Sequence, residues 1–467
     1  MKKMLCVLMA AICVASVTFI SGCDKAVDRS VYTIEASLED KTVTARMKLD
    51  YYNDTQSELN SLAFHLYPNA YSEGGSLVSS DLAAAFPRGA SYGKIDISEV
   101  KSEEENLQYE VNGDIMTVTV PSLFPTQRIQ VEMAFAVTLP EGKHRLGYFE
   151  GKYNLGNWYP VLCAFDTDWK THPYYVNGDP FDSSVADYYV TLNYPSSLTA
   201  VSSGGIGSGG TLSAKAINVR DFAVVLGEFN VKTASVGDIK INYCSEGEED
   251  RTPVISQALS FFSDTFGKYA YDEYNVVRTA FFSGGMEYPA MCFVSDALDE
   301  KTSEEVIIHE TAHQWWYAAV GNDQVYEAWL DEGLAEYSTT VFYEKHSNYG
   351  IKRENRIADS LTTYSLYCEI YTHGKQTPMR KCVGDYVTVS DYTFNTYVRG
   401  QLMLDSLRTV IGDKAFFEGL KLYYKENSGK VATAANLIGA MEKTSARNLQ
   451  SYFDSWLSGK TMLYSVS

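Results

Sequence analysis

Two histidines and a glutamate with the spacing of a metal site lie in the segment "IIHETAHQ", residues 307–314. On a helix, residues four apart share one face, so His309 and His313 can direct their imidazoles at a single ion. Neutral histidine is a zinc ligand, and a zinc site that activates water needs a third protein ligand beside an open position. Glu310 projects next to that face and could act as general base toward the water. The segment predicts a hydrolytic zinc site, provided that the chain supplies a third ligand.

The third ligand is expected in the segment "EAWLDEGLAEY". Between His313 and Glu332 lie 18 residues, enough for a turn and a second helix that returns toward the first. Asp331 points about 100° away from Glu332 round that helix, whereas Glu336 shares its face one turn further on. Spacing therefore favours Glu332 and leaves Glu336 as the stronger rival.

Together, the two segments resemble the zinc signature of the aminopeptidase N-like metallopeptidases (gluzincins), HExxHxW followed by WLNEGFA. The match consists of "HETAHQWW", the 18-residue gap and "WLDEGLAEY", so residues 314–316 and 329–335 extend it beyond the five-residue core. The resemblance implies one zinc ion held by His309, His313 and Glu332, with Glu310 as general base. It also implies an enzyme that removes N-terminal residues from peptides by attack of a metal-activated water. Peptides with a free N-terminus are thus the expected partners.

The same family places its anchor for the substrate amine in a G-x-M-E-N segment, and this chain has "GGMEY" from Gly284 onward. The resemblance implies that Glu287 holds the ammonium group. Gly284, Gly285 and Met286 would lie alongside the extended peptide, because glycine allows close backbone approach. Tyr288 departs from the asparagine of the family.

A hydrogen-bond donor near the metal would stabilise the oxyanion that forms when water attacks an amide. The family uses a tyrosine ahead of a helix start of the E-K-G type, and "NTYVRGQLMLDSL" matches that context at Tyr397. Arg399 and Gly400 stand where Lys-Gly is usual. The resemblance implies this role for Tyr397, and Tyr392, five residues earlier, is the rival.

Residues 31–235 read as an N-terminal β domain. Apolar and polar residues alternate in short runs, and "LQYEVNGDIMTVTV" predicts a hairpin around Asn112-Gly113. Many short strands separated by turn signals indicate a sandwich or an open saddle of sheets.

Residues 236–467 read as a mostly helical domain. The pair Thr302 and Glu305 predicts a capped start for a helix over 303–320 that stops at Gly321 and carries both histidines. The expected fold class is α+β, with the β domain followed, as the resemblance implies, by a thermolysin-like catalytic domain.

The first residues, "MKKMLCVLMAAICVASVTFISGC", are predicted to be a targeting signal. Two lysines, an apolar run and small residues before Cys23 are the parts of a secretory signal, and the cysteine resembles the lipobox of bacterial lipoproteins. We expect a signal peptide over 1–22, a lipid on Cys23 and a tether over 23–30. The protein would then be anchored on the extracytoplasmic face of a membrane in the bacterial cell envelope.

Composition narrows the classes of partner. The formal net charge is −20, which argues against nucleic acid and against anionic membranes bound through basic patches. The cysteines after Cys23 are dispersed and lack C-x-x-C spacing, so a cysteine metal site is not expected.

Three other functions stay open from the residues alone. They are a zinc endopeptidase with an open cleft, a peptide-binding lipoprotein on a peptidase scaffold, and another zinc hydrolase activity. Glu287 argues against the first, and peptides with acetylated N-termini would discriminate it. Glu310 and Tyr397 argue against the second, because a binding protein does not need them.

Overall fold

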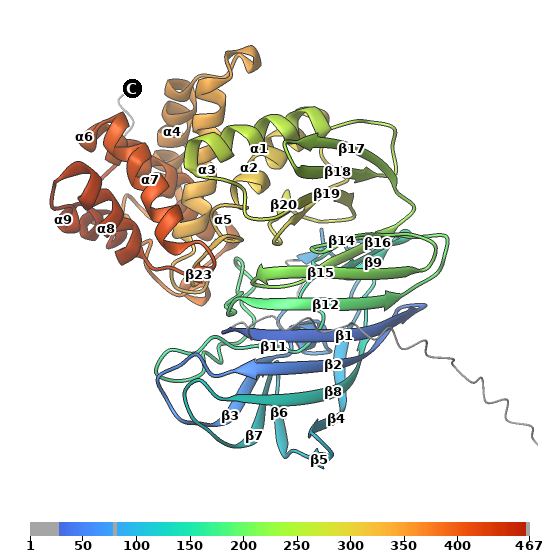
Figure 1. The fold of residues 1–467 in the computed structure, drawn as a ribbon. Coiled ribbons are helices and arrows are strands. Elements are labelled where there is room, and N and C mark those ends of the chain that lie inside the picture. Colours follow the sequence, from blue (N-terminus) through green and yellow to red (C-terminus); the bar gives the residue numbers. More distant parts are fainter. Residues whose placement is uncertain (1–27, 78–81, 464–467) are drawn as a thin grey trace, which may run out of the picture.

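The computed structural model describes residues 28–77 and 82–463. The predicted signal peptide and Cys23 lie outside these residues. Within them, no helix has both the length and the apolar character needed to cross a membrane. A β-rich part, blue to green in Figure 1, is followed by a mostly helical part, yellow to red. The expected α+β class is confirmed.

The N-terminal domain is built from three β-sheets around one core. Its strands are β1 Ser30–Glu39, β2 Thr42–Tyr52, β3 Leu59–His65, β4 Lys94–Ser102, β5 Glu105–Asn106, β6 Tyr109–Asn112, β7 Ile115–Leu123, β8 Arg128–Thr138, β9 Leu146–Phe149, β10 Lys152–Leu155, β11 Val161–Leu162, β12 Ala186–Asn193, β13 Thr199–Ser202, β14 Gly205–Gly207, β15 Thr211–Val219 and β16 Val224–Gly227. The sheet orders are β15-β12-β1-β2-β8-β4-β5, β14-β13-β16-β10-β9 and β11-β3-β7-β6. Buried and exposed residues alternate along β2, as expected of a strand with one face on a core. The predicted hairpin is present as the antiparallel pair β6 and β7.

The second domain has a five-stranded sheet and a two-stranded sheet among its helices. Its strands are β17 Asn230–Val236, β18 Ile239–Ser245, β19 Glu273–Thr279, β20 Gly285–Met286, β21 Met291–Ser295, β22 Val320–Gly321 and β23 Lys430–Val431. Its helices are α1 Thr252–Phe266, α2 Glu300–Ala312, α3 Trp329–Lys345, α4 Arg353–Tyr371, α5 Val389–Thr393, α6 Arg399–Ile411, α7 Asp413–Asn427, α8 Ala434–Ser445 and α9 Gln450–Leu457.

The division between the domains falls slightly earlier than the predicted boundary at 235. Strand β17 pairs with β18 in the sheet β17-β18-β19-β21-β20, so it belongs to the second domain. Its alternating pattern is the same as that of the strands before it, and only the pairing distinguishes them. The edge strand of this sheet, β20, lies on the side facing the N-terminal domain (Figure 1).

Helix α2 differs from the prediction at both ends. It ends at Ala312 rather than continuing to residue 320, because the chain turns at once and Trp316 forms an isolated bridge with Val320. The apolar run after the turn is buried, and periodicity does not separate a buried turn from a buried helix. Asp299 caps the start of the helix, with its side chain accepting from the Thr302 amide, so Thr302 is not the cap.

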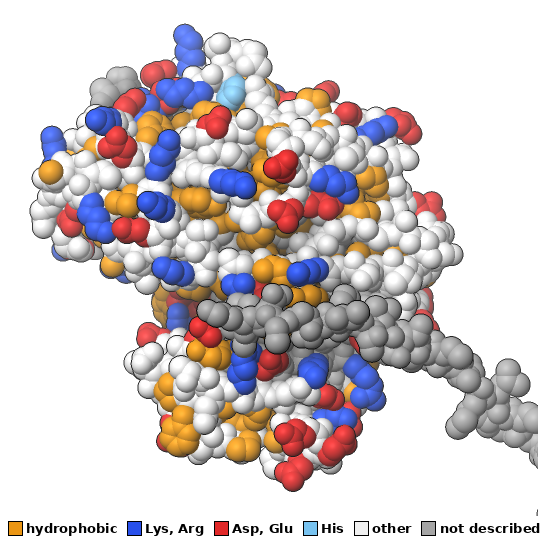
Figure 2. Space-filling model, in the orientation of Figure 1, with side chains coloured by type: hydrophobic (Ala, Val, Ile, Leu, Met, Phe, Trp, Pro, Cys, Tyr) orange, Lys and Arg blue, Asp and Glu red, His pale blue; other side chains and the backbone are white. Residues whose placement is uncertain are grey.

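Charged side chains of both signs are mixed over the face of the molecule in Figure 2. Lysine and arginine do not gather into a single patch on that face.

Candidate active site

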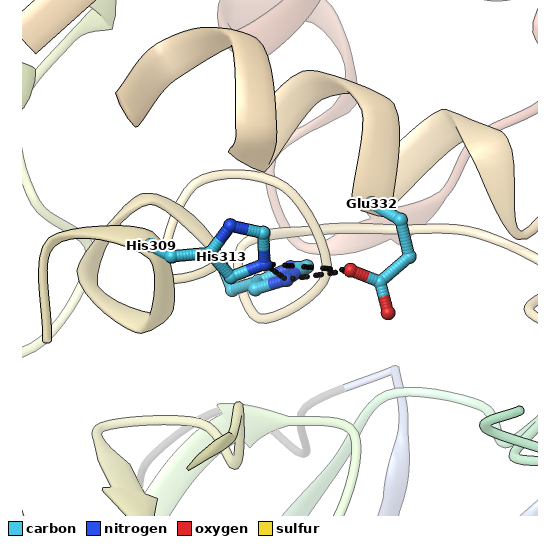
Figure 3. A group of neighbouring side chains, drawn as sticks. All are labelled: His309, His313 and Glu332. Atoms are coloured by element: carbon cyan, nitrogen blue, oxygen red, sulfur yellow. Dashed lines mark hydrogen bonds and ion pairs between the residues drawn. The ribbon is translucent and has the colours of Figure 1, made fainter. Parts of the chain in front are cut away.

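Helices α2 and α3 bring the three predicted metal ligands together (Figure 3). His313 Nε2 lies 3.0 Å from His309 Nε2 and 3.2 Å from Glu332 Oε2, and His309 Nε2 lies 3.5 Å from the same oxygen. The histidines lie at the end of α2 and the glutamate in the first turn of α3. Ligands of a tetrahedral zinc ion, bonded at about 2.0–2.2 Å, lie roughly 3.3 Å from one another. The donor spacing matches that requirement.

Hydrogen bonds on the outer edge of each ring turn lone pairs toward the centre of the site. His313 Nδ1 lies 2.9 Å from the Trp316 carbonyl oxygen, and His309 Nδ1 lies 3.3 Å from Glu336 Oε2. A neutral imidazole that donates from Nδ1 presents only a lone pair at Nε2. Two lone pairs and a carboxylate oxygen that face one another repel unless a cation lies between them. The residues therefore fit a zinc ion.

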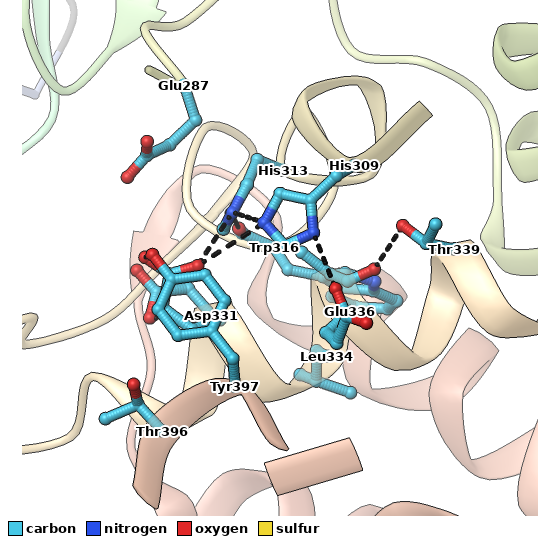
Figure 4. A network of polar contacts seen from close by, with 12 residues as sticks. Glu287, His309, His313, Trp316, Asp331, Leu334, Glu336, Thr339, Thr396 and Tyr397 are labelled. Carbon is cyan, nitrogen blue, oxygen red and sulfur yellow. Dashed lines mark hydrogen bonds and ion pairs between the residues drawn. The ribbon is translucent and has the colours of Figure 1, made fainter. Parts of the chain in front are cut away.

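Glu336 contacts the predicted ligand His309 on the side of the ring that faces away from the other donors. Its carboxylate faces the Nδ1 edge of His309, as Figure 4 shows, and also accepts from Arg356 (2.9 Å) and Gln401 (3.2 Å). The Nε2 edge of the ring faces Glu332 instead. Geometry thus separates the two glutamates that spacing left as rivals.

We expect Glu336→Ala to weaken zinc binding about 10- to 100-fold, because His309 loses the carboxylate that fixes its ring and tautomer. The measurement is the zinc Kd from competition with a chromogenic chelator. Glu344→Ala is the matched control, since Glu344 lies on the same helix and pairs with Arg408 rather than with a histidine. Equal zinc affinity in the two variants would contradict the supporting role.

Glu310 lies beside the donors in a cleft of about 410 Å³. Its side chain is buried, and its Oε2 has no hydrogen-bond partner among the described residues. Gly285 makes room for it, since a Cβ there would lie 2.4 Å from Glu310 Oε1. Burial raises the pKa of Glu310 to about 7. A carboxyl with that pKa can both take up and return a proton near neutral pH.

Glu287 follows β20 and reaches the same cleft. Glu287, Glu310 and His313 carry ligand-type atoms within 4.8 Å of one another. Gln324 donates to Glu287 Oε1 (2.9 Å) and to Asp331 Oδ2 (2.8 Å). Asp331 thus accepts from the Gln324 amide, and it is not in the group formed by His309, His313 and Glu332. The structure therefore does not favour Asp331 as a metal ligand.

Asp179 is a second carboxylate at this position, and the sequence analysis missed it. It lies in the N-terminal domain, 108 residues before Glu287, in a loop without a recognisable motif. Arg145 donates to it, and Asp179, Glu287 and Glu332 carry oxygens within 4.8 Å of one another. Burial raises the pKa of Glu287 well above its ordinary range, and the neighbouring Asp179 adds to the effect. Close, buried carboxylates favour a cation between them.

Tyr397 lies in a π-helical turn, Phe394–Val398, that leads into α6. Its hydroxyl donates to Glu332 Oε1 at 2.5 Å, and its ring lies 5.8 Å from the His309 ring. The hydroxyl of the rival, Tyr392, is buried and has no hydrogen-bond partner within the described part of the chain. Geometry favours Tyr397 as the donor next to the metal ligands.

Two glycines allow the close helix crossing that brings Tyr397 to the site. A Cβ on Gly400 of α6 would lie 2.7 Å from the Gly333 Cα of α3, and one on Gly333 would lie 3.0 Å from the Gly400 Cα. Both contacts are with backbone, which cannot rotate away. Helices α3 and α6 can therefore approach closely only because neither residue has a side chain.

We expect Gly400→Ala to destabilise the protein by about 1–3 kcal/mol, because the added methyl pushes the two helices apart. Turnover should fall more than stability alone explains, since Tyr397 moves with α6. Thermal unfolding and kcat are the measurements. Gly439→Ala in α8 is the control, because a Cβ there meets no atom within 4 Å. Wild-type Tm and kcat in Gly400→Ala would refute the crowding argument.

Two histidines at the end of one helix and a glutamate on the next form a metal centre with the donor set and spacing expected of a gluzincin. Residues 252–456 match the model of the peptidase family M1 domain. The second domain is therefore similar to the peptidase family M1 domain, in agreement with the resemblance seen in the sequence.

Similar proteins agree with that assignment. Aminopeptidase N of Escherichia coli is 28% identical over 264 residues, 51% of this chain and 29% of that protein. Aminopeptidase B of Mus musculus is 27% identical over 194 residues, 38% of this chain and 28% of that protein. The chain thus spans less than a third of the length of these relatives.

One solved structure shares the two-domain fold over nearly the whole chain. An M1 zinc metallopeptidase from Deinococcus radiodurans superposes with a TM-score of 0.66 at 18% identity, covering 94% of this chain and 95% of that chain. This likeness supports the fold, with its N-terminal β domain and helical second domain.

Proposed function

We propose that this protein is a zinc-dependent aminopeptidase that removes N-terminal residues from peptides. The observation that carries the proposal is the pair of buried carboxylates, Glu287 and Asp179, directly beside the metal donors. A peptide whose first carbonyl lies at the metal would place its N-terminal ammonium group beside that pair. The M1 domain and its aminopeptidase relatives support the same activity.

The main polar residues of the cleft can then be assigned roles in catalysis. A zinc ion on the three donors would polarise a water molecule and the carbonyl of the first peptide bond. Glu310 takes the proton that the attacking water loses and returns it to the leaving amine. Tyr397, whose single hydroxyl hydrogen points to Glu332 in the structure, would turn that hydrogen to the negative charge that develops on the carbonyl oxygen. Glu287 and Asp179 hold the ammonium group, which sets the register of cleavage to one residue.

The proposal is tested with the purified protein and a peptide panel, each peptide free and N-acetylated, with and without a chelator. We expect removal of single N-terminal residues from free peptides, loss of activity with chelator, and recovery with zinc. Equal cleavage of acetylated peptides would favour an endopeptidase, and chelator-insensitive cleavage would exclude zinc catalysis. Binding of peptides without cleavage would indicate a binding protein.

Asp179→Asn should raise KM for free peptides about 10-fold or more, since a hydrogen bond to a charged group contributes about 1.5–3 kcal/mol. Turnover should change less, because Asp179 does not touch the reacting carbonyl in the proposed register. Steady-state kinetics measure both. Asp187→Asn is the control, a buried carboxylate of the same domain that pairs with Arg29 instead. An unchanged KM would remove Asp179 from the amine site.

We also propose that Cys23 carries a lipid that anchors the protein to the bacterial cell envelope, facing away from the cytoplasm. The support is the signal-like segment and the small residues before Cys23. Radiolabelled fatty acid should be incorporated into the wild-type protein and not into Cys23→Ser. Incorporation into that variant, or none into the wild type, would refute the anchor.

A further inference from the structure

The segment that carries Glu287 has two faces with different partners. Side chains alternate along an extended chain, so Met286 and Tyr288 point opposite to Glu287. Glu287 reaches the cleft, whereas Met286 and Tyr288 are buried in a hydrophobic cluster formed mainly by the N-terminal domain. Glu287 therefore belongs to the cleft, while its neighbours Met286 and Tyr288 form part of the contact between the domains.

The N-terminal domain forms a close-fitting site for Tyr288. The ring is fully buried and its hydroxyl donates to Asn157 Oδ1 of the N-terminal domain at 3.3 Å, while Phe293 of β21, in the second domain, lies 4.9 Å from it ring to ring. A Cβ on Gly156 would lie 1.9 Å from the Tyr288 hydroxyl, so only glycine leaves room for the phenol. The Arg145 guanidinium, which also binds Asp179, donates to Met286 Sδ at 3.0 Å.

The zinc helix holds the same segment from the other side. Gln314, the residue after His313, donates to the Tyr288 carbonyl at 3.0 Å and accepts from the Ala290 amide at 2.8 Å. The backbone next to Glu287 is therefore fixed between the N-terminal domain and the end of α2.

We propose that Tyr288 is a positioning residue that fixes the Glu287 carboxylate in the cleft by docking its segment on the N-terminal domain. The proposal rests on the proposed aminopeptidase function and answers what a tyrosine does where the family has asparagine. The side chain makes no contact with the substrate. It determines instead how firmly the amine anchor is held relative to Asp179 and the metal donors.

The test compares Tyr288→Asn, Gly156→Ala and the double variant. Each single change should raise KM for free peptides about 10-fold or more and leave kcat within about 3-fold, because small displacements of binding groups are costly. Zinc content should stay unchanged. In the Tyr288→Asn background, most of the cost of Gly156→Ala should disappear, although its methyl still meets the Arg145 carbonyl oxygen at 2.9 Å.

Tyr243→Asn is the matched control, a fully buried tyrosine of the second domain's own core whose loss should lower Tm without raising KM. Additive effects of Tyr288→Asn and Gly156→Ala, or a KM rise in the control, would overturn the proposal.

Calorimetric binding of leucinamide and N-acetyl-leucinamide to the zinc-loaded protein separates this proposal from the function on which it rests. Preference for the free amine in the wild type, lost in Tyr288→Asn, supports the positioning role even if no peptide is cleaved. Preference retained in Tyr288→Asn overturns that role alone. Equal binding of both ligands to the wild type overturns the amine site and the positioning role together.

Discussion

We expect a Glu310→Gln variant to bind zinc as the wild type does and to hydrolyse peptides about 10²- to 10⁴-fold more slowly. Glutamine has nearly the same shape as glutamate, but its amide cannot accept a proton from water near neutral pH. Because the Glu310 Oε2 has no partner among the described residues, the exchange breaks no hydrogen bond at that atom. The loss should appear in kcat rather than in KM.

The measurements are single-turnover kinetics and zinc content by elemental analysis. Glu305→Gln is the control, since Glu305 lies on the same helix, lines the same cleft and pairs with Arg356. Turnover within tenfold of the wild type in Glu310→Gln would remove Glu310 from its role as base. A loss of zinc would place it among the ligands.

Replacing Glu332 with alanine should weaken zinc binding by more than about 100-fold, beyond the range seen when a supporting residue is removed. Two histidines alone leave the ion without its carboxylate, the only negatively charged donor of the set. The change also removes the oxygen that accepts from Tyr397. Peptide hydrolysis should therefore stay lost even when zinc is in excess.

Zinc affinity and activity at rising zinc concentration measure this effect. Asp331→Asn is the control, because Asp331 is the adjacent carboxylate and is held by Gln324. Retained zinc affinity in Glu332→Ala would return the third-ligand role to Glu336. A comparable loss in Asp331→Asn would show that charge near the site, rather than ligation, governs affinity.

The part of the site that follows from local spacing could be predicted from the sequence. His309, Glu310 and His313 lie about one helical turn apart, so periodicity places them together, and Glu332 lies on the next long helix, which a turn can return toward them. Spacing favours Glu332 over Glu336 only slightly, because both share one face. The choice between them depends on which nitrogen of His309 each carboxylate meets.

The features that could not be predicted from the sequence depend on contacts between the domains and between strands. Asp179 lies in a loop of the N-terminal domain, and nothing in its neighbourhood indicates that the fold brings it to Glu287. The direction of the Tyr288 side chain depends on a site formed by Gly156 and Asn157. Strand β17 could not be assigned to its domain because its pattern is the same in either sheet.

The fit between Gly156 and Tyr288 also limits the order in which this protein can evolve. While tyrosine occupies position 288, any side chain at position 156 collides with its hydroxyl. Position 288 can change first, at the cost of a looser anchor, and only afterwards is position 156 less crowded, with the Arg145 carbonyl oxygen still close by. Among descendants of this sequence, a larger residue at 156 should therefore be found only where Tyr288 has already been replaced.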